Sequence, residues 1–441
     1  MDHSSSFDTP DPSYAELIAA RPSLDMHAHD GLLMDGVPLA AIADAVGTPS
    51  WVYSAATITR RARRLREALA PIGAHIHYAV KANDHLAVLG LLAAEGCGAD
   101  VVSAGELARA RRAGIDPADI VFSGVGKTNG ELREALGCGV GQINVESAEE
   151  LDMLSAVASS MGATARIALR VNPDVDAGTH AKITTGKAEN KFGIPYRDAV
   201  NLALRASSLP GIQFRGIALH IGSQILSMTP YRAAYARAAE LVGILRRQGL
   251  VIDVVDCGGG LGIPYRDEPA AAPEALAGAI KAELGGLNLK LMVEPGRWLV
   301  GPAGILLTSV VLVKFTGERR FVVLDAAMND LIRPSLYEAW HGILPVSPVD
   351  AVAPQVLADV VGPVCESGDT FARGRSLPAF RPDARVAILD TGAYGAVMSS
   401  TYNARPLAAQ VLVADGGWKL IRPRQSIEDL WRDEIVPAPQ G

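Results

Sequence analysis

The sequence predicts a (β/α)8 barrel joined to a second domain that is mostly β, and three observations predict it. Short apolar runs with strand-like composition recur at 75–81, 98–103, 119–124, 141–146, 165–172, 214–221, 251–256 and 289–294. Alanine- and leucine-rich stretches with helical spacing separate these runs. Beyond residue 300 the helical spacing fades, and short runs separated by Gly, Pro and Asp predominate.

Eight strand–helix units in about 250 residues are what a (β/α)8 barrel requires. A doubly wound sheet is the alternative, although it usually has fewer strands and a glycine-rich first turn. With 441 residues, the chain is long enough for two domains. We expect a barrel over 48–300, a β domain made from 25–47 with 301–441, and a disordered tail over 1–24. The runs at 305–315, 320–325, 355–361, 386–390 and 408–413 predict strands of the β domain.

Composition indicates a soluble globular protein, with 49% apolar and 20% charged residues. A net charge of −7 argues against nucleic acid as a partner, and the basic run at 60–66 is interpreted as the solvated face of a helix. The most apolar run, 299–313, is interrupted by glycine and proline and falls short of the roughly 18 residues of a membrane span. Four widely spaced cysteines, with no signal peptide in the polar first 22 residues, predict reduced thiols and a cytoplasmic location. We expect no metal site.

Polar residues gather where the predicted strands end, which is where (β/α)8 barrels place their chemistry. The strand ends carry Lys81, Asp100, Ser123, Lys127, Asn144, Glu146, Arg170, His220, Asp256 and Glu294. Lys81 closes the first strand. An amine that loses solvent there holds its proton less tightly, and carbonyl chemistry requires the neutral form. The alternative is that Lys81 simply emerges into solvent.

Three further features fit a phosphorylated pyridine cofactor. Gly258, Gly259 and Gly260 follow the seventh strand, where barrels often bind phosphate, although a glycine run by itself usually marks a turn. Glu294 closes the eighth strand and could keep a pyridine nitrogen protonated, or pair with an arginine. His220 could lie against such a ring, or be an ordinary core histidine. Together with Lys81 these residues indicate pyridoxal 5′-phosphate (PLP).

Several motifs carry a resemblance to a known family. YAVKAN at 78–83, HIGSQ at 220–224, GGGLG at 258–262 and EPGR at 294–297 resemble the fold-type III PLP-dependent decarboxylases. The resemblance is narrower, to the diaminopimelate decarboxylases, at RVNPDVDA (170–177), NKFG (190–193), MNDLIRP (328–334), CESGD (365–369) and GAYG (392–395). It extends over about residues 35–425 with the motifs in order.

The resemblance implies decarboxylation of meso-2,6-diaminopimelate to L-lysine, the last step of lysine biosynthesis. It implies three catalytic residues: Lys81 bound covalently to the cofactor, His220 stacked on its ring, and Cys365 as the proton donor. It implies that the cofactor is bound by Lys81, Asp100, His220, Ser223, Gly258, Gly259, Gly260, Glu294, Pro295, Gly296, Arg297 and Tyr394. It assigns the substrate to Arg297, Arg333, Tyr337, Glu366 and Tyr394. In this family Cys365 and Glu366 reach the neighbouring subunit's site, so a homodimer is implied.

Charge favours diaminopimelate over a diamine precursor, because its far end carries both a carboxylate and an ammonium. Arg297 and Arg333 offer bidentate forks for the carboxylate, Tyr337 adds a hydroxyl, and Glu366 suits the ammonium. Arg333 and Glu366 could instead pair with each other. We interpret the polar loop over 178–193 as a lid that excludes water.

Other functions stay open. A decarboxylase of ornithine, arginine or a carboxylated polyamine on the same scaffold is the nearest alternative. More distant alternatives are a PLP racemase, a PLP-binding homeostasis protein and a structural barrel without catalysis. The second domain, with its candidate catalytic groups, argues against the homeostasis protein, which is usually a lone barrel.

Overall fold

The computed structural model describes residues 11–176 and 191–437. The chain divides into two compact units. The barrel unit consists of Thr57–Pro264 and Glu268–Gly301, and the β unit consists of Met1–Ala56, Tyr265–Asp267 and Pro302–Gly441. The predicted lid falls largely on 177–190 and so lies outside the described residues. No helix in the described ranges has both the length and the apolar character needed to cross a membrane.

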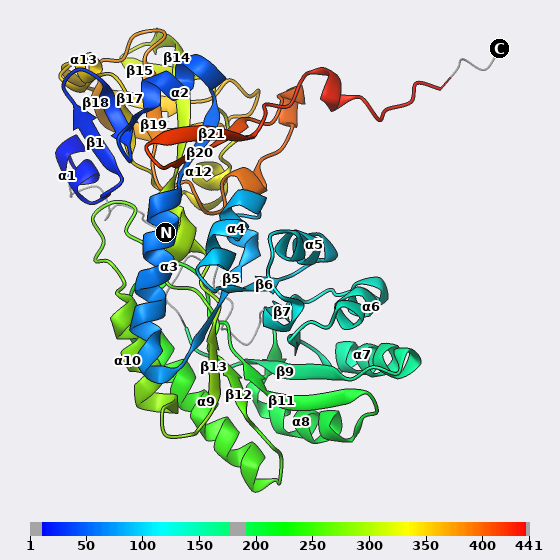
Figure 1. Cartoon of the computed structure of the whole chain (residues 1–441). Coiled ribbons are helices and arrows are strands. Elements are labelled where there is room, and N and C mark those ends of the chain that lie inside the picture. The colour runs from blue at the N-terminus through cyan, green and yellow to red at the C-terminus, as the bar shows by residue number, and fades with distance from the viewer. Residues whose placement is uncertain (1–10, 177–190, 438–441) are drawn as a thin grey trace. The chain divides into compact units, whose positions relative to one another are not determined.

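The barrel unit contains a closed ring of eight parallel strands (Figure 1). In ring order these are β5 (His75–Ala79), β6 (Gly98–Val101), β7 (Ile120–Phe122), β8 (Gln142–Val145), β9 (Ala165–Asn172), β11 (Ile212–Ala218), β12 (Val254–Asp256) and β13 (Lys290–Val293). Pairing of β13 with β5 closes the ring, and the two-residue β10 (Ile194–Pro195) adds to β9. Val121, Val254 and Met292, from three of the strands, form a small apolar cluster. The predicted barrel is confirmed, and all eight predicted strands form.

Helices lie outside the ring of strands (Figure 1). They are α3 (Ala55–Leu69), α4 (Leu86–Ala94), α5 (Ala104–Arg112), α6 (Asn129–Cys138), α7 (Ala148–Met161), α8 (Ala199–Ser208), α9 (Thr229–Arg247) and α10 (Pro273–Leu284). A short helix, α11 (Arg297–Val300), follows β13. Ser103, Thr128 and Ser147 begin α5, α6 and α7 by accepting the N–H of the third helical residue, which is a glutamate in each case. These caps stand a few residues after strand ends, so each helix starts close to the carboxyl end of the preceding strand.

The β unit is built on a sheet with the order β18-β17-β15-β14-β4-β20-β21, to which β19 and β16 attach. Its strands are β4 (Ser50–Ser54), β14 (Gly304–Thr316), β15 (Arg319–Leu324), β16 (Ile343–Pro345), β17 (Gln355–Val361), β18 (Thr370–Pro378), β19 (Arg385–Ile388), β20 (Ala409–Ala414) and β21 (Gly417–Arg422). The short helices α12 (Arg333–Tyr337) and α13 (Pro348–Ala351) lie between strands.

Strand β4 explains why residues before 57 group with the β unit, although the expected barrel range began at 48. It pairs with β14 on one side and β20 on the other. Trp51 and Tyr53 enter one apolar cluster of this unit and Val52 enters another. Because successive strand residues face opposite sides, β4 buries apolar side chains on both faces of the sheet.

The structure differs from the expected disordered tail at 11–24. Ser13 and Glu16 form a capping box that starts α1 (Tyr14–Ala19), and Leu17 is buried. Buried Arg21 forms an ion pair with Asp390. The chain continues through β1 (Leu24–His27), β2 (Gly31–Met34), β3 (Val37–Pro38) and α2 (Leu39–Val46). Buried apolar residues of these elements belong to the same apolar cluster as Val52 of β4, so this segment is part of the folded unit.

Candidate active site

Lys81 lies in a single turn of 3-10 helix, Val80–Ala82, immediately after β5. Its Nζ donates a hydrogen bond of 2.7 Å to Oδ2 of Asp100 on β6. Asp100 is fully buried, whereas the lysine side chain is 35% exposed. Oδ1 of Asp100 has no hydrogen-bond partner within the described parts of the chain. Lys81 is therefore held by a buried carboxylate instead of simply extending into solvent, and one oxygen of that carboxylate is left for a further donor.

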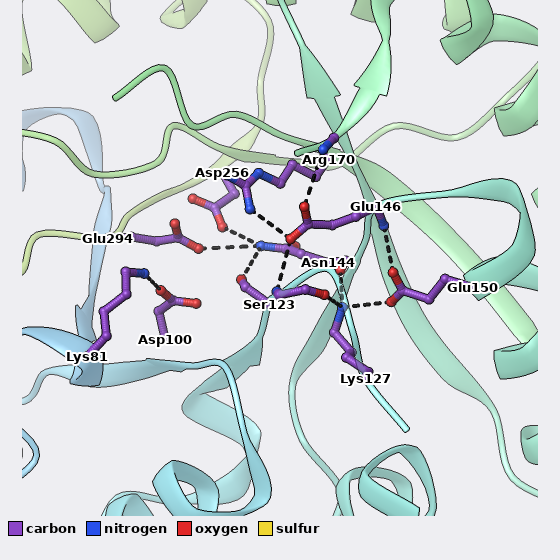
Figure 2. Close-up of polar contacts among 12 residues, drawn as sticks. Lys81, Asp100, Ser123, Lys127, Asn144, Glu146, Glu150, Arg170, Asp256 and Glu294 are labelled. Carbon is purple, nitrogen blue, oxygen red and sulfur yellow. Dashed lines mark hydrogen bonds and ion pairs between the residues drawn. The ribbon is translucent and has the colours of Figure 1, made fainter. Parts of the chain in front are cut away.

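Glu294 directly follows β13 and is buried among other carboxyl groups (Figure 2). The side-chain Nδ2 of Asn144 lies 3.4 Å from Oε1 of Glu294 and 3.1 Å from Oδ2 of Asp256. Burial raises the pKa of Glu294 well above its ordinary value, and the charges of Asp100 and Asp256 raise it further, while Lys81 opposes the shift. In this arrangement Glu294 holds a proton readily.

The glycine run is packed so tightly that side chains do not fit. A Cβ on Gly258 would lie 2.1 Å from the carbonyl oxygen of Leu219, and one on Gly259 would lie 2.1 Å from that of Glu294. Gly260 has a φ of +99° and would place a Cβ 2.4 Å from the carbonyl oxygen of Gly222. The Gly258 N–H donates to Asp256 at 3.0 Å. Backbone packing therefore requires glycine at these three positions, and the loop carries no side chains that would keep an anion away from it.

The segment that follows Glu294 connects the glycine side of the barrel to the lysine side. The carbonyl oxygen of Pro295 accepts the N–H of Ala79, at the end of the strand before Lys81. A Cβ on Gly296 would lie 3.0 Å from the Cβ of Ala82, so the two segments pack closely at this point. Nη2 of buried Arg297 donates to Oγ of Ser223 at 3.1 Å. The structure thus brings these predicted residues together around one end of the barrel.

His220 lies two residues after β11. Burial lowers its pKa well below the ordinary value, and the positive charges of Arg170 and Lys81 lower it further. The imidazole is therefore neutral at physiological pH, a form that can pack against an aromatic ring without a charge to desolvate.

The other predicted residues belong to the β unit. Arg333, at the start of α12, is buried, with Nη1 2.9 Å from Nε2 of His341 and its guanidinium 4.7 Å from the ring centre of Tyr265. Tyr337 ends the same helix. Tyr394 adopts a positive φ of 55°.

Cys365 and Glu366 lie on an exposed but well-braced loop of the β unit. Asp369 accepts the N–H groups of Met328 and Val364 at 2.7 Å each. The Cys365 N–H donates to Oδ1 of Asn403 at 2.9 Å. Ser335 of α12 donates to the carbonyl oxygen of Gly368 at 2.6 Å, so the loop is fixed to the helix that carries Arg333 and Tyr337.

Glu106 in α5 is a further candidate site residue, which the sequence patterns did not identify. Its carboxylate accepts the Val102 N–H at 2.8 Å and experiences the charges of Lys81 and Asp100. Burial raises its pKa to about 7, with the Val102 hydrogen bond opposing the shift. The sequence signal for a role of Glu106 is its position in the first turn of the helix that follows the strand carrying Asp100.

A polar network at the barrel mouth also received no role in the sequence analysis. It joins Ser123, Lys127, Asn144, Glu146, Glu150, Arg170 and Asp256 to Glu294 (Figure 2). All of these residues except Glu150 were recognised as strand-end residues. The contacts of Asn144 with Asp256 and Glu294 join different strand ends, and these pairings depend on how the barrel closes.

Comparison with known proteins agrees with this geometry. Residues 55–301 match the model of the family "Pyridoxal-dependent decarboxylase, pyridoxal binding domain". The chain is 51% identical to diaminopimelate decarboxylase of Zymomonas mobilis over 91% of this chain and 96% of that protein. Its fold matches the crystal structure of Helicobacter pylori diaminopimelate decarboxylase complexed with L-lysine, with a TM-score of 0.86, 40% identity, and 89% and 98% of the two chains covered. The M. jannaschii diaminopimelate decarboxylase in complex with L-lysine matches with a TM-score of 0.90 and 35% identity over 95% and 99%.

Proposed function

Because the chain belongs to the diaminopimelate decarboxylases, a family of pyridoxal-dependent decarboxylases, we propose that it converts meso-2,6-diaminopimelate to L-lysine and carbon dioxide with PLP as cofactor. The observation that carries this proposal is the barrel mouth itself. There an amine held by a buried carboxylate, a buried glutamate and a side-chain-free glycine loop meet within one unit. Lysine biosynthesis is the pathway that this product implies.

The residues present fit the chemical groups of PLP. Lys81 offers an amine for its aldehyde, the loop at Gly258, Gly259 and Gly260 offers bare backbone for its phosphate, and Glu294 offers a carboxyl group for its ring nitrogen. The unpartnered Oδ1 of Asp100 leaves room for a further donor beside Lys81. When bound, the cofactor supplies an electron sink for the electron pair released as the carboxylate leaves.

The chain's own residues then orient groups and transfer protons. Asp100 holds the Lys81 amine in place, and Glu294 keeps a proton at the ring nitrogen. Neutral His220 would pack against the cofactor ring. Cys365 transfers its thiol proton to the substrate α-carbon, which takes the electron pair left by carbon dioxide. Ser223 and Arg297 would help to hold the cofactor, and we assign Tyr394 to cofactor and substrate binding.

We assign the far end of the substrate to Arg333, with Arg297, Tyr337 and Glu366 contributing. Arg333 is supported by its burial and by the His341 and Tyr265 contacts that fix its guanidinium. A fixed planar fork suits a carboxylate, which diaminopimelate has at its far end and ornithine lacks.

The test is to incubate the purified protein with PLP and, in parallel, meso-diaminopimelate, ornithine and arginine, measuring carbon dioxide and product. We expect turnover of diaminopimelate alone, and an Arg333→Ala variant that loses at least about 100-fold in kcat/KM for it. Faster release of carbon dioxide from ornithine or arginine would favour the related decarboxylases. Racemisation without carbon dioxide would favour the racemase.

We further propose a homodimer that shares its active sites, in which Cys365 and Glu366 serve the neighbouring subunit. Mixing the Lys81→Ala and Cys365→Ala variants should then restore activity. If dimers form at random, about half of them contain one subunit of each variant, and each of these has one intact site of two, which gives about a quarter of the wild-type activity. Mixtures as inactive as their components would contradict sharing. We also propose a cytoplasmic location, supported by the free thiols of all four cysteines, and cell fractionation tests it.

A further inference from the structure

Asn144 reaches across the barrel to the side opposite its own strand. In the ring of eight strands, β8 and β13 stand four positions apart in either direction. Nδ2 of Asn144 lies 3.1 Å from Oγ of Ser123, 3.1 Å from Oδ2 of Asp256 and 3.4 Å from Oε1 of Glu294. Its two hydrogens therefore serve three oxygens, two of which belong to carboxyl groups on neighbouring strand ends.

A hydrogen bond from Gln142 fixes the orientation of the Asn144 side-chain amide. Gln142, two residues earlier on the same face of β8, donates to Oδ1 of Asn144 at 2.8 Å. Because Oδ1 accepts that bond, Nδ2 must face the carboxyl groups of Asp256 and Glu294.

The strand end that carries Asn144 is anchored by a buried ion pair. Lys127 has a fully buried side chain, and its Nζ donates to the carbonyl oxygens of Gly124 at 2.8 Å and Asn144 at 2.7 Å, and to Oε1 of Glu150 at 2.6 Å. The second oxygen of Glu150 accepts the N–H of Glu146 at 2.9 Å. Lys127 and Glu150 together thus bind the backbone on both sides of Val145.

A barrel does not need such groups for its core. Interiors of (β/α)8 barrels are filled mainly by branched apolar side chains, and buried polar groups are costly unless they are bonded. Here one lysine (Lys127), three glutamates (Glu146, Glu150 and Glu294) and two amides (Gln142 and Asn144) are buried and connected by hydrogen bonds. Figure 2 labels all of these residues except Gln142. The arrangement is understandable if the position of Glu294 matters for function.

We propose that Asn144 is a positioning residue whose amide holds the carboxyl groups of Glu294 and Asp256 in one arrangement, from a strand end fixed by Lys127 and Glu150. The proposal rests on the proposed function, in which Glu294 faces the ring nitrogen of PLP. Without the amide, the two carboxyl groups lose their shared donor and Glu294 is no longer aimed at the ring nitrogen.

The test compares two ligands on the apoenzyme: PLP, and its 1-deaza analogue, in which a C–H replaces the ring nitrogen. Dissociation constants are measured by absorbance titration, without turnover. We expect wild type to prefer PLP, and Asn144→Ala to bind PLP about tenfold more weakly while its affinity for the analogue changes less than about twofold. Ser155→Ala is the matched control, because it removes a partly buried hydrogen bond of 2.8 Å from α7 to the Pro210 carbonyl oxygen. It should alter neither affinity.

Equal loss of affinity for both ligands, or for neither, would overturn the proposal, because Asn144 would then not act through the ring nitrogen. Asn144→Ser, which keeps a donor, covers the case in which Asn144→Ala does not fold. Failure of both variants to fold would also overturn the proposal, since the amide would then be a determinant of the barrel itself. A wild type that does not bind PLP at Lys81 would instead refute the proposed function, and peptide mapping detects that separately.

Discussion

Replacing Lys127 by methionine should lower the free energy of unfolding of the apoenzyme by about 3–5 kcal/mol, because it leaves a buried partner charge uncompensated. The structure supports the upper part of this range. The ammonium is fully buried, makes three hydrogen bonds of 2.6–2.8 Å, and is the ion-pair partner of Glu150, which is 7% exposed. Lys281→Met, on the exposed face of α10, is the control and should cost less than about 0.5 kcal/mol.

The loss should be recovered when the opposing charge is removed as well. Lys127→Met with Glu150→Gln removes both charges of this buried pair, so we expect stability within about 1–2 kcal/mol of wild type. The effect of the single variant should also shrink as the pH falls. Burial raises the pKa of Glu150 and Lys127 opposes that shift, so without Lys127 the folded state binds the Glu150 proton more tightly than the unfolded chain does.

The assay is urea unfolding at pH 8 and pH 5, with hydrogen exchange of peptides from β8 to locate the change. A single variant within about 0.5 kcal/mol of wild type would refute the reasoning, because it would mean that the pair is not buried in solution. A double variant as unstable as the single one would refute it as well, since the damage would then be steric.

Two further predictions concern other positions at the barrel mouth. Through Glu106, the wild-type protein should lose about 2 kcal/mol of stability between pH 5 and pH 8, a figure reduced for the partial exposure of the side chain. The Glu106→Gln variant should not show this loss. The pKa of Glu106 in the folded protein, about 7, lies above its ordinary value of 4.5. The contribution of Glu106 to stability is therefore greatest below pH 4.5 and is lost as the pH rises through 7. Urea titrations in which variant and wild type show the same pH dependence would contradict this prediction. Gly260→Ala should weaken PLP binding by at least about tenfold and cost about 1–3 kcal/mol, because its Cβ would meet the Gly222 carbonyl. Gly73→Ala shares the positive φ but has open space around the Cβ, so equal affinities in the two variants would contradict the steric argument.

The strands of the barrel were predictable because each is a short apolar run that ends on polar residues or glycine. The β unit was harder to predict. Strand β21 was missed, although Asp415 and Gly416 between two apolar runs are a hairpin signal. Strand β18 was missed because exposed Arg373 and Gly374 interrupt its apolar pattern. The polar composition of 11–24 predicts a disordered tail and outweighs the short Ser13 and Glu16 capping box, which begins a helix in the structure.

The candidate site was predictable in part, for a similar physical reason. Lys81, Asp100 and Glu294 stand at strand ends, and a barrel brings all strand ends to one face. The pairing of Asn144 with Glu294 joins residues 150 positions apart, on strands that do not touch. Such a contact depends on the order and closure of the whole ring, which local patterns do not specify.

The central claim is that Lys81 is the residue that binds PLP covalently. Reduction of the PLP-loaded protein with borohydride, followed by peptide mapping, tests this claim most directly. We predict a pyridoxyl group on Lys81 and none on Lys127, whose amine is fully buried in the network. An adduct on another lysine, or a protein that takes up no cofactor at saturating PLP, would contradict the account.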